Sequence, residues 1–333
     1  MPTSDNFENY MVKLILYTKN CYNFFMGNAL KFLLLKHEFL SGLTILVGCI
    51  LLLFATYPNN NFLTILPILF SWFGSLLMID YGNRRINKRT FFPNFKHHHY
   101  FIEFCTISLV WCLGLEFLGS WTVRYWYYNP AFTPLAYVIV APVAFIAYSI
   151  LILSCYELLK KKFNKPSFGR DSNSLKTRLN LVHSVLFIVG LIGLTFSILE
   201  ILRLAQIQNF NFFDFNKFNP TDVAWWLPFV CPYSLFVVLE YFGYKQGKET
   251  LIKDLLKGNY FPILLIFISS LILVILVEYS NVPFKIWEFS NWPLNDIKLW
   301  TLPITAILTW QSQFYVFFSM LRIFTKPSEI DLW

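Results

Sequence analysis

Eight apolar runs, each about as long as a bilayer's hydrocarbon core is thick, constrain the fold of this chain more than any other feature. The runs cover residues 39–57, 62–79, 100–118, 135–155, 181–199, 223–242, 260–279 and 301–324. A hydrocarbon core about 30 Å thick needs roughly 20 apolar residues per helix. Because lipid offers no water to open backbone groups, each run must be helical. The sequence therefore predicts an all-α fold, a polytopic transmembrane bundle of about eight spans.

Few charged residues are available to make a surface that faces water. Charged residues make up 14% of the 333 residues, and hydrophobic residues make up 56%. A soluble domain usually carries about 25% charged residues, so lipid is the natural solvent for this chain. The chain contains no P-loop, dinucleotide glycine fingerprint, C-x-x-C pair or H-E-x-x-H motif. The sequence thus indicates no cofactor, no metal site and no nucleic-acid partner, and it leaves open whether the protein is an enzyme.

Lys and Arg are distributed unevenly between alternate loops. Of the 27 Lys and Arg residues, only five fall in the loops of one side: Arg124, Arg203, Lys217, Lys285 and Lys298. Cytoplasmic loops carry the excess of Lys and Arg in membrane proteins. We therefore expect a multi-pass protein of the plasma (inner) membrane with both termini in the cytoplasm, and with the lipid bilayer as its surrounding partner.

The two halves of the chain look like two copies of one unit, offset by about 161 residues. The matches, in order, are Leu66-Pro67 with Leu227-Pro228, Asp80 with Glu240, Gly82 with Gly243, Glu116 with Glu278, Arg124 with Lys285, Trp126 with Trp287, and Pro142 with Pro303. Because each unit has an even number of spans, both copies share one orientation, related by an axis along the membrane normal. The sequence predicts two parallel four-helix repeats, with Pro142 and Pro303 inside the fourth helix of each.

This pattern divides the chain into five segments. They are an N-terminal cytoplasmic or interfacial arm (1–37), a first four-span repeat (38–160), a basic cytoplasmic linker (161–180), a second four-span repeat (181–325) and a C-terminal tail (326–333). The arm carries Lys13, Lys19 and Lys31 among apolar residues. That mixture favours a helix lying in the inner interface over a ninth span.

Two acids near the outer ends of the third and seventh predicted spans are the first candidate site. Glu116 and Glu278 are the predicted catalytic residues, because acids within spans are costly and mark functional sites by default. The side chains predicted to bind substrate beside them are Arg124, Trp126, Tyr128, Lys285 and Trp287. One acid could protonate an alkene or a leaving group while the other acts as a base. The alternative is structural, with basic and aromatic side chains clamping the outer loop at the interface.

A second pair of acids lies at the opposite ends of the spans. Asp80 and Glu240 each stand close to a run of basic residues. They form either a cytoplasmic polar cluster or solvated ion pairs at the interface. A polar path that reached from the outer acids to this pair would favour transport.

The residues of the first half resemble those of a known family. Ser71-Trp72-Phe73-Gly74 through Asp80 to Arg84, then Glu116 and Tyr125-Trp126-Tyr127-Tyr128, are similar to an uncharacterised family of internally duplicated prokaryotic polytopic membrane proteins. The second half adds Gly247-Lys248 through Leu251, Glu278, Trp287 and Leu302-Pro303. The likeness covers about residues 62–324. It implies the fold and supplies no activity.

A weaker likeness is to membrane-integral carotenoid cyclases and the related hydratases. These proteins share an acid near a helix end, an aromatic W-x-Y element and then a proline, and the matching residues here are Glu116, Trp126, Tyr128 and Pro142. The paired-acid P-x-E-E element of the cyclases is replaced by Pro142-Val143-Ala144-Phe145. Any proton chemistry that this resemblance implies would therefore fall to Glu116 and Glu278.

Two function classes follow from these observations. The first is a membrane enzyme or binder for a lipophilic, isoprenoid-like small molecule at the outer leaflet. The second is a transporter or a structural subunit of a membrane complex, with other membrane proteins as partners. A site that holds both Glu116 and Glu278 favours the first class.

Overall fold

The computed structural model describes residues 40, 42–48, 65–87, 98–128, 134–162, 173–207, 224–281, 287–299 and 302–325. Its helices after residue 48 are α3 (Ile65–Asn87), α4 (His98–Glu116), the π-helix η5 (Phe117–Thr122), α5 (Pro134–Lys162), α6 (Asn173–Ile207), α7 (Leu227–Lys245), α8 (Leu251–Leu256), α9 (Phe261–Asn281) and α10 (Ile304–Phe324). Its strands are β1 (Trp126–Tyr128), β2 (Trp287–Phe289), β3 (Lys298–Leu299) and β4 (Leu302–Pro303). The predicted arm (1–37) and tail (326–333) lie outside the described residues.

Five helices in the described part of the chain are long and apolar enough to cross a membrane. Their spans are Tyr100–Ser120, Pro142–Lys160, Thr177–Leu204, Leu227–Lys245 and Phe261–Glu278. The prediction of a helical fold is confirmed, and these five helices are candidate membrane spans by length and composition. Helices α3 and α10 also lie where spans were predicted, at 62–79 and 301–324, but neither is among the five.

Helix α10 differs from the five spans because it is enclosed by other helices. Most of its residues are buried, among them Thr309, Gln311, Ser312 and Ser319. A helix surrounded by protein does not need a lipid-facing apolar surface, so it can carry polar side chains that a peripheral span could not. The central position of α10 thus explains why this helix is less apolar than the five candidate spans.

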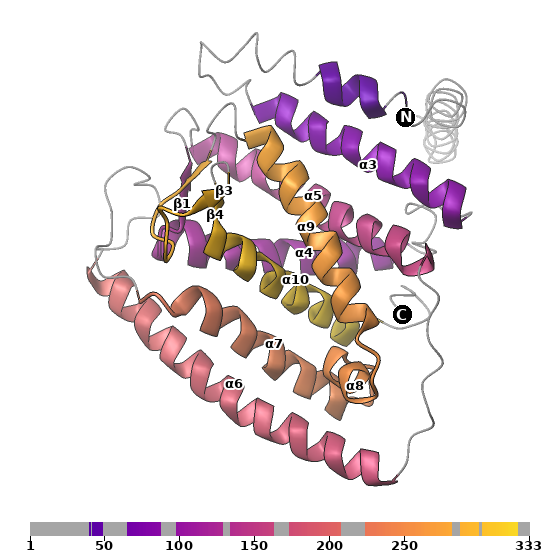
Figure 1. The fold of residues 1–333 in the computed structure, drawn as a ribbon. Helices are drawn as coiled ribbons and strands as arrows, with labels where there is room; N and C mark the ends of the chain where they lie inside the picture. The colour runs from indigo at the N-terminus through magenta and orange to yellow at the C-terminus, as the bar shows by residue number, and fades with distance from the viewer. Residues whose placement is uncertain are drawn as a thin grey trace, which may run out of the picture.

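Four helices form a closed ring at the centre of the bundle. Helix α5 packs against α4 and α9, and α10 packs against the same two helices from the other side. Outside the ring, α3 packs on α5, α7 packs on α10, and α6 packs on α7 at the edge of the molecule. Figure 1 shows α6 as the outermost helix, with α7 and α10 in successive layers behind it.

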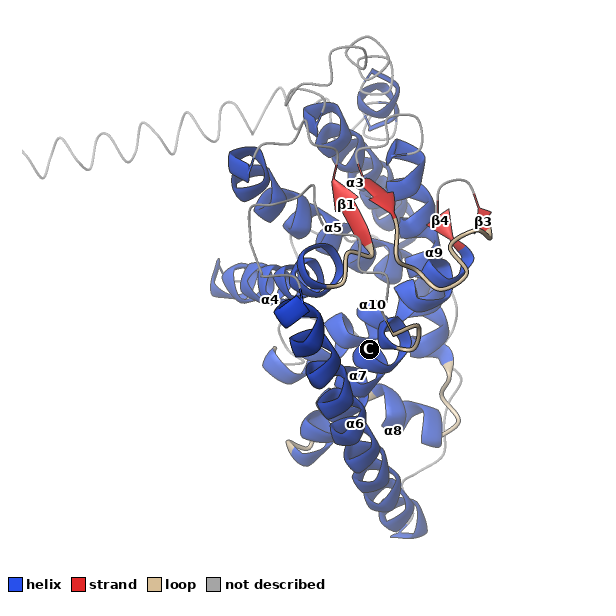
Figure 2. Ribbon diagram, turned by 90° about the vertical axis from the view of Figure 1, so that its left-hand side faces the viewer, coloured by secondary structure: helices blue, strands red, loops and turns tan. Residues whose placement is uncertain are grey.

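The two ends of the bundle differ in structure. Strands β1, β3 and β4 gather at one end, the left side of Figure 1, whereas α8 lies at the opposite end near the start of α9. In Figure 2 the strand-bearing end faces the viewer, with the ribbon that contains β1 in front of the helices and β3 and β4 at the right-hand edge. We call these ends the ribbon end and the α8 end.

An antiparallel ribbon at the ribbon end joins two segments that are far apart in the sequence. Strand β1 pairs with β2 so that Trp126 lies opposite Phe289, Tyr127 opposite Glu288, and Tyr128 opposite Trp287. The pairing continues beyond the strands, since the Ser290 amide donates to the Tyr125 carbonyl at 3.0 Å. The ribbon therefore ties the α4–α5 connection to the α9–α10 connection.

Glycines allow α6 and α7 to approach closely. A Cβ at Gly193 would lie 2.1 Å from Ser234 Oγ, and one at Gly190 would lie 2.5 Å from Val237 Cγ2. Small residues at such crossings let two backbones pack without side chains between them, as in many membrane-helix pairs. This contact holds α6 to the bundle although most of its surface faces outward.

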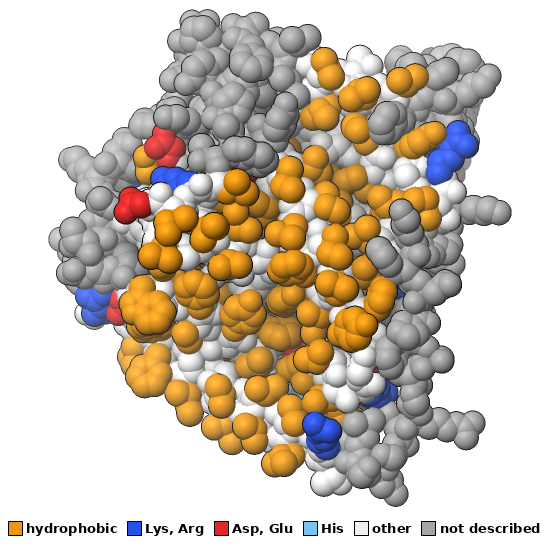
Figure 3. Space-filling view, viewed as in Figure 1, with side chains coloured by type: hydrophobic (Ala, Val, Ile, Leu, Met, Phe, Trp, Pro, Cys, Tyr) orange, Lys and Arg blue, Asp and Glu red, His pale blue; other side chains and the backbone are white. Residues whose placement is uncertain are grey.

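An apolar surface covers the face of the molecule between the two ends. In Figure 3 hydrophobic side chains spread across this face, and most of the charged side chains in view lie toward its left, right and lower edges. On α6, Ile188, Ile192 and Phe196 are all more than half exposed. Apolar exposure on this scale suits contact with a lipid bilayer.

Two sequence expectations differ from the structure in detail. Pro142 lies inside α5 as predicted, but the prediction that Pro303 lies inside its helix was wrong, since Pro303 is the N-cap of α10. Proline has no N–H to donate and fits readily at a helix start, where that donor has no helical partner. Helix α6 begins at Asn173, so residues 173–180 of the predicted linker are helical.

Candidate functional site: two buried glutamates beneath a ribbon

Glu116 ends α4 and is bound by side chains of β1. The carboxylate is 5% exposed. Tyr128 donates its hydroxyl to Glu116 Oε1 at 2.7 Å, and Trp126 donates its indole N–H to Glu116 Oε2 at 3.4 Å. The π-helix η5 follows directly, with the Val123 amide donating to the Leu118 carbonyl. Single π turns often occur at functional sites, and this one returns the chain toward its own helix end.

A glycine in the π-helix makes room for the Trp126 ring. A Cβ at Gly119 would lie 1.9 Å from Cη2 of Trp126, so no other residue fits there without moving the indole. The ring of Trp126 therefore lies directly on the η5 backbone. The position of the Trp126 N–H beside Glu116 depends on this close approach.

Glu278, near the end of α9, has a matching arrangement. Its carboxylate is 1% exposed, and the Trp287 indole N–H donates to Oε1 at 3.0 Å. Asn281 holds both groups: its amide donates to Glu278 at 3.4 Å and to the Trp287 carbonyl at 2.9 Å. The Trp287 backbone N–H donates back to Asn281 Oδ1 at 3.1 Å. The buried Asn281, three residues after Glu278, was not anticipated from the sequence.

The ribbon brings the two glutamates under a single surface. Successive side chains of a strand point to opposite faces, so Trp126, Tyr128 and Trp287 share one face of the β1–β2 ribbon. All three donate to a buried glutamate. Four of the predicted site residues on β1, β2 and α4, together with Glu278 on α9, thus lie in one assembly.

The opposite face of the ribbon carries its own hydrogen bond. Tyr127 donates its hydroxyl to Glu288 Oε2 at 2.6 Å. This bond, with some burial, raises the pKa of Tyr127 to about 12. Tyr127 is 37% exposed, so this pair lies at the surface and the glutamates lie beneath it.

Arg124 contributes to the site through its backbone carbonyl. It adopts a positive φ of 60°, and its side chain is buried. Its carbonyl accepts hydrogen bonds from Ser290 Oγ and from the Asn291 amide, the latter at 3.0 Å. These bonds lock the turn before β1 onto the segment after β2. The other predicted basic residue, Lys285, lies outside the described residues.

Aromatic side chains of the central helices form a cluster near Glu278. Trp310 donates its indole N–H to the Tyr148 hydroxyl at 2.6 Å, and Tyr148 stacks on Trp111 with ring centroids 5.9 Å apart. Tyr148 lies close enough to Glu278 to interact with it electrostatically. Sequence reasoning missed these residues because single aromatics inside apolar runs look like ordinary core residues.

At the α8 end, Asp80 and Glu240 have different surroundings. Asp80 on α3 is buried and accepts from Arg84, one turn later, with Nε and Nη2 each 3.3 Å from Oδ2. Glu240 on α7 is 1% exposed and accepts from the Ile252 amide at 2.8 Å and from Ser319 Oγ at 2.7 Å. Glu240 therefore ties α7 to both α8 and α10, whereas Asp80 pairs within its own helix.

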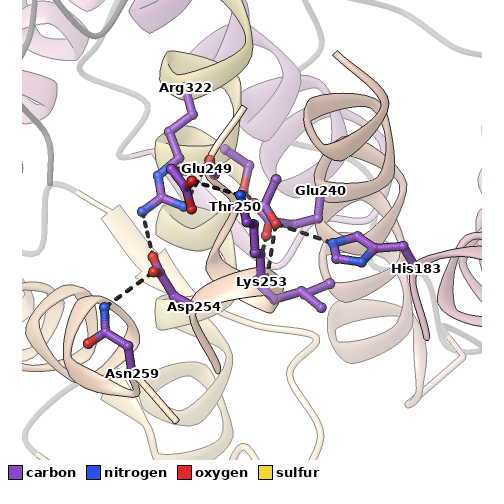
Figure 4. A network of polar contacts seen from close by, with 10 residues as sticks. His183, Glu240, Glu249, Thr250, Lys253, Asp254, Asn259 and Arg322 are labelled. Carbon is purple, nitrogen blue, oxygen red and sulfur yellow. Dashed lines mark hydrogen bonds and ion pairs between the residues drawn. The ribbon is translucent and has the colours of Figure 1, made fainter. Parts of the chain in front are cut away.

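Glu240 belongs to a larger polar network around α8, shown in Figure 4. Arg322 pairs with Asp254 at 3.3 Å and also donates to the Glu249 carbonyl at 3.3 Å. Asn259 donates to the other Asp254 oxygen at 3.2 Å. Burial raises the pKa of Asp254, and this effect outweighs the Arg322 charge, which acts in the opposite direction.

Thr250 connects this network to α6. Its hydroxyl accepts from the Lys253 amide at 3.1 Å, which caps the start of α8. The same hydroxyl lies 3.2 Å from His183 Nε2, while His183 Nδ1 lies 2.9 Å from the Leu179 carbonyl. His183 also stacks on Tyr244 at 4.1 Å. Through Thr250 and Tyr244, His183 fastens α6 to α7 and to the α7–α8 connection.

Comparisons with known proteins add no relative. Among the residues that the structure describes, no three His, Cys, Asp or Glu side chains are grouped so as to hold a metal ion. No protein-family model matches the chain, and no curated protein or solved structure matches it either. The fold and site together define a class: a helical protein with apolar helices of membrane-spanning length and two buried glutamates, capped by a ribbon that joins distant segments of the chain.

Proposed function

We propose that this protein binds a long apolar, isoprenoid-like substrate at the ribbon end and acts on it by proton transfer through Glu116 and Glu278. The observation that carries this proposal is the placement of both buried carboxylates beneath one aromatic face of the β1–β2 ribbon. Two carboxyl groups in one low-dielectric setting can divide the roles of acid and base between them. Proton transfer to an alkene or a leaving group requires that division.

The surrounding aromatics suit an apolar substrate. Trp126, Tyr128 and Trp287 offer π faces that stabilise a developing positive charge, and their N–H and O–H groups keep the carboxylates oriented. In this proposal these three residues bind the substrate, with Arg124 at the border of the site. No cofactor is required for such a reaction.

An internal duplication accounts for the paired arrangement. Trp126 donates to Glu116 as Trp287 donates to Glu278, and the ribbon register places Tyr127 opposite Glu288, the residue 161 positions later. The packing of α5 on α9 has its counterpart in α10 on α4, and that of α3 on α5 in α7 on α10. These equivalences support two four-span repeats, eight spans in all, with the site at their interface.

Charge distribution supports an orientation for this bundle. Lys245, Lys248, Lys253 and Lys257 all lie in or beside the α7–α8 connection. The positive-inside rule assigns that end to the cytoplasm. The ribbon end then faces the outer leaflet of the plasma membrane, and the substrate reaches the site from that side.

A transporter or a structural subunit is the second candidate. Each glutamate is held by at least two side-chain hydrogen bonds, which is also what a structural clamp requires. The Glu240–Ser319–Ile252 contacts fasten three elements at the α8 end in the same way. In this reading the glutamates hold the α4–α5 and α9–α10 connections in place for a partner or for a rocking motion.

Mass spectrometry of lipids that co-purify with the protein in mild detergent separates these functions. We expect a near-stoichiometric isoprenoid or lipid with the wild-type protein, lost or chemically altered with the Glu116→Gln, Glu278→Gln double variant. Glu288→Gln is the matched control, because Glu288 bonds to Tyr127 on the other face of the ribbon. An unchanged lipid profile in the double variant would refute the enzyme proposal and favour the clamp.

A further inference from the structure

Gln311 stands out among the buried residues of the central ring. Its side chain is 2% exposed, near the middle of α10. Neither its amide nitrogen nor its carbonyl oxygen has a hydrogen-bond partner among the described residues. A buried amide with both ends unpaired is costly, and more so in a membrane where water is excluded. Each such group needs an explanation, such as an ordered water, an ion or a bound ligand that completes its hydrogen bonds.

Other polar groups of the ring share this property. Ser108 and Trp111 on α4, and Ser269 on α9, are buried with a hydroxyl or an indole N–H that has no partner in the described part of the chain. Ser108 lies on the face of α4 that packs on α10, since Phe104 and Trp111, on either side of it along that face, both contact Phe317. Ser154 Oγ on α5 is likewise buried with no partner among the described residues. The unpaired groups therefore belong to all four helices of the ring.

The parts of the four ring helices that surround Gln311 contain no charged residue. Residues 104–115, 134–156, 261–277 and 304–321, which make up most of its four helices, contain no Asp, Glu, Lys or Arg. A phosphate or carboxylate placed there would have no countercharge and would be strongly disfavoured. A neutral hydroxyl or carbonyl group can both donate to and accept from an amide such as that of Gln311.

The aromatic side chains beside these groups indicate the chemical nature of the non-polar part of the ligand. Trp111 packs against Phe314 at 5.5 Å and Phe317 at 4.6 Å, and Tyr148 packs against Phe314 at 5.5 Å. Flat apolar side chains of this kind suit an unsaturated hydrocarbon chain. The polar groups would then fix the position of its single polar end.

We infer that Gln311, with Ser108, Ser269 and Trp111, binds the neutral hydroxyl or carbonyl end of an unsaturated hydrocarbon ligand inside the α4–α5–α9–α10 ring. This inference rests on the proposed function and specifies its ligand as an alcohol or ketone rather than a phosphate. Ser108 lies eight residues before Glu116 on α4, a rise of roughly 12 Å at 1.5 Å per residue. The ligand extends over that length, with its polar end at Gln311 and its reacting bond beside the glutamates.

Equilibrium binding of radiolabelled farnesol and farnesyl phosphate to the purified full chain in detergent tests this site. The two probes differ only in the polar end. We expect the wild-type protein to bind farnesol at least tenfold more tightly than the phosphate, and Gln311→Leu to weaken farnesol binding at least tenfold. Gln313→Leu is the matched control, because Gln313 is a less buried glutamine of the same helix.

Several outcomes would overturn the inference: no saturable farnesol binding, a preference for the phosphate, or unchanged farnesol affinity in a folded Gln311→Leu variant. If Gln311→Leu does not fold, Ser108→Ala and Trp111→Phe give the same test with smaller changes. The Glu116→Gln, Glu278→Gln variant separates this site from the proposed function. If that variant keeps the wild-type lipid profile while farnesol binding depends on Gln311, the proton-transfer proposal is refuted and the Gln311 binding site is supported. If the lipid profile changes while farnesol binding does not depend on Gln311, only the binding site is refuted.

Discussion

At the scale of single residues, the two indole-to-carboxylate hydrogen bonds decide how the candidate site is built. Trp126 and Trp287 each donate to a glutamate that is at most 5% exposed. A buried carboxylate that loses one donor keeps its full desolvation cost. The contribution of each bond to stability is therefore larger than that of a hydrogen bond at the surface.

Replacement of either tryptophan by phenylalanine measures that contribution. We expect Trp287→Phe to lower the free energy of unfolding by about 1–3 kcal/mol, and Trp126→Phe to do so by less, because its bond to Glu116 is longer. Thermal unfolding in detergent is the measurement. Trp225→Phe is the control, since Trp225 is 71% exposed; equal melting temperatures for all three variants would contradict the expectation.

The Tyr127–Glu288 pair gives the ribbon a pH dependence. The pKa of Tyr127 is about 12 in the folded protein, above the ordinary value of 10. The folded state therefore holds this proton longer than the unfolded state, and stability falls as pH rises from about 10 toward 12. We expect the wild-type melting temperature to fall more steeply over that range than that of Tyr127→Phe. Tyr260→Phe, which removes an exposed tyrosine at the α8 end, should behave like the wild type.

The acidic and aromatic residues of the candidate site could be predicted from the sequence, whereas the residues that position them could not. Glu116, Trp126 and Tyr128 were all singled out, and the structure places them in contact. Gly119 and Asn281 were not, because their roles depend on where the Trp126 ring and the Trp287 backbone lie after folding. Glycine and asparagine have too many ordinary uses for either to be recognised from its position alone.

At the scale of helices and strands, the α6–α7 contact is sensitive to a single added methyl group. A Cβ at Gly190 would lie 2.5 Å from Val237 Cγ2 and 3.0 Å from the Ser234 carbonyl. Since a backbone atom blocks one side, the two helices must separate to admit it. Overpacking of this kind typically costs about 1–3 kcal/mol.

We expect Gly190→Ala to lower the melting temperature and to expose α6 to added protease. Gly114→Ala is the matched control, because a Cβ at Gly114 on α4 meets nothing within 4 Å. Alanine favours a helix over glycine by about 1 kcal/mol, so the control should equal or exceed the wild type. A Gly190→Ala variant as stable as Gly114→Ala would mean that α6 does not rely on this close approach.

The helices could be predicted from the sequence because each apolar run carries its own signal. The β1–β2 ribbon could not, since Trp126–Tyr128 and Trp287–Phe289 are three residues long and look like interfacial aromatics. Pairing between such distant segments has no local turn signal. Helix α10 was expected as a span like the others, although its buried Gln311 and Ser312 reflect its central position.

At the scale of the whole molecule, the two halves are joined by helix packing and by the ribbon as well as by the chain itself. Helix α5 packs on α9, α4 packs on α10, and the ribbon joins β1 to β2. The chain between α5 and α6 covers residues 163–172. We expect two halves produced by cutting a protease site placed within that segment to remain together in mild detergent, as judged by co-purification on a tag carried by one half.

A disulfide across the ribbon tests the same arrangement. In a background without the native cysteines, Tyr127→Cys with Glu288→Cys should cross-link the two halves under mild oxidation, because these positions are direct partners in the register. Tyr127→Cys with Tyr260→Cys should not, since Tyr260 lies beside the start of α9 at the opposite end. Halves that separate on cutting and fail to cross-link would contradict this packing.

Membrane orientation makes a separate prediction for the molecule as a whole. The orientation proposed from the excess of Lys and Arg at the α8 end puts that end in the cytoplasm. In intact cells a membrane-impermeant thiol reagent should therefore label Tyr127→Cys, and should label Lys253→Cys only after the membrane is opened. The reverse pattern would invert the proposed topology and move the glutamates to the cytoplasmic leaflet.

The ribbon also has a consequence for how the protein is made. A ribosome must add 161 residues after Tyr127 before its partner Glu288 exists. At about 5–20 residues per second, β1 remains an unpaired edge at the membrane surface for roughly 8–30 seconds. Over the same interval Ser290 and Asn291, which donate to the Arg124 carbonyl in the finished protein, have not yet been made. A nascent chain that stalls before β2 therefore displays an open strand. That strand would let a surveillance chaperone or protease distinguish unfinished molecules from finished ones.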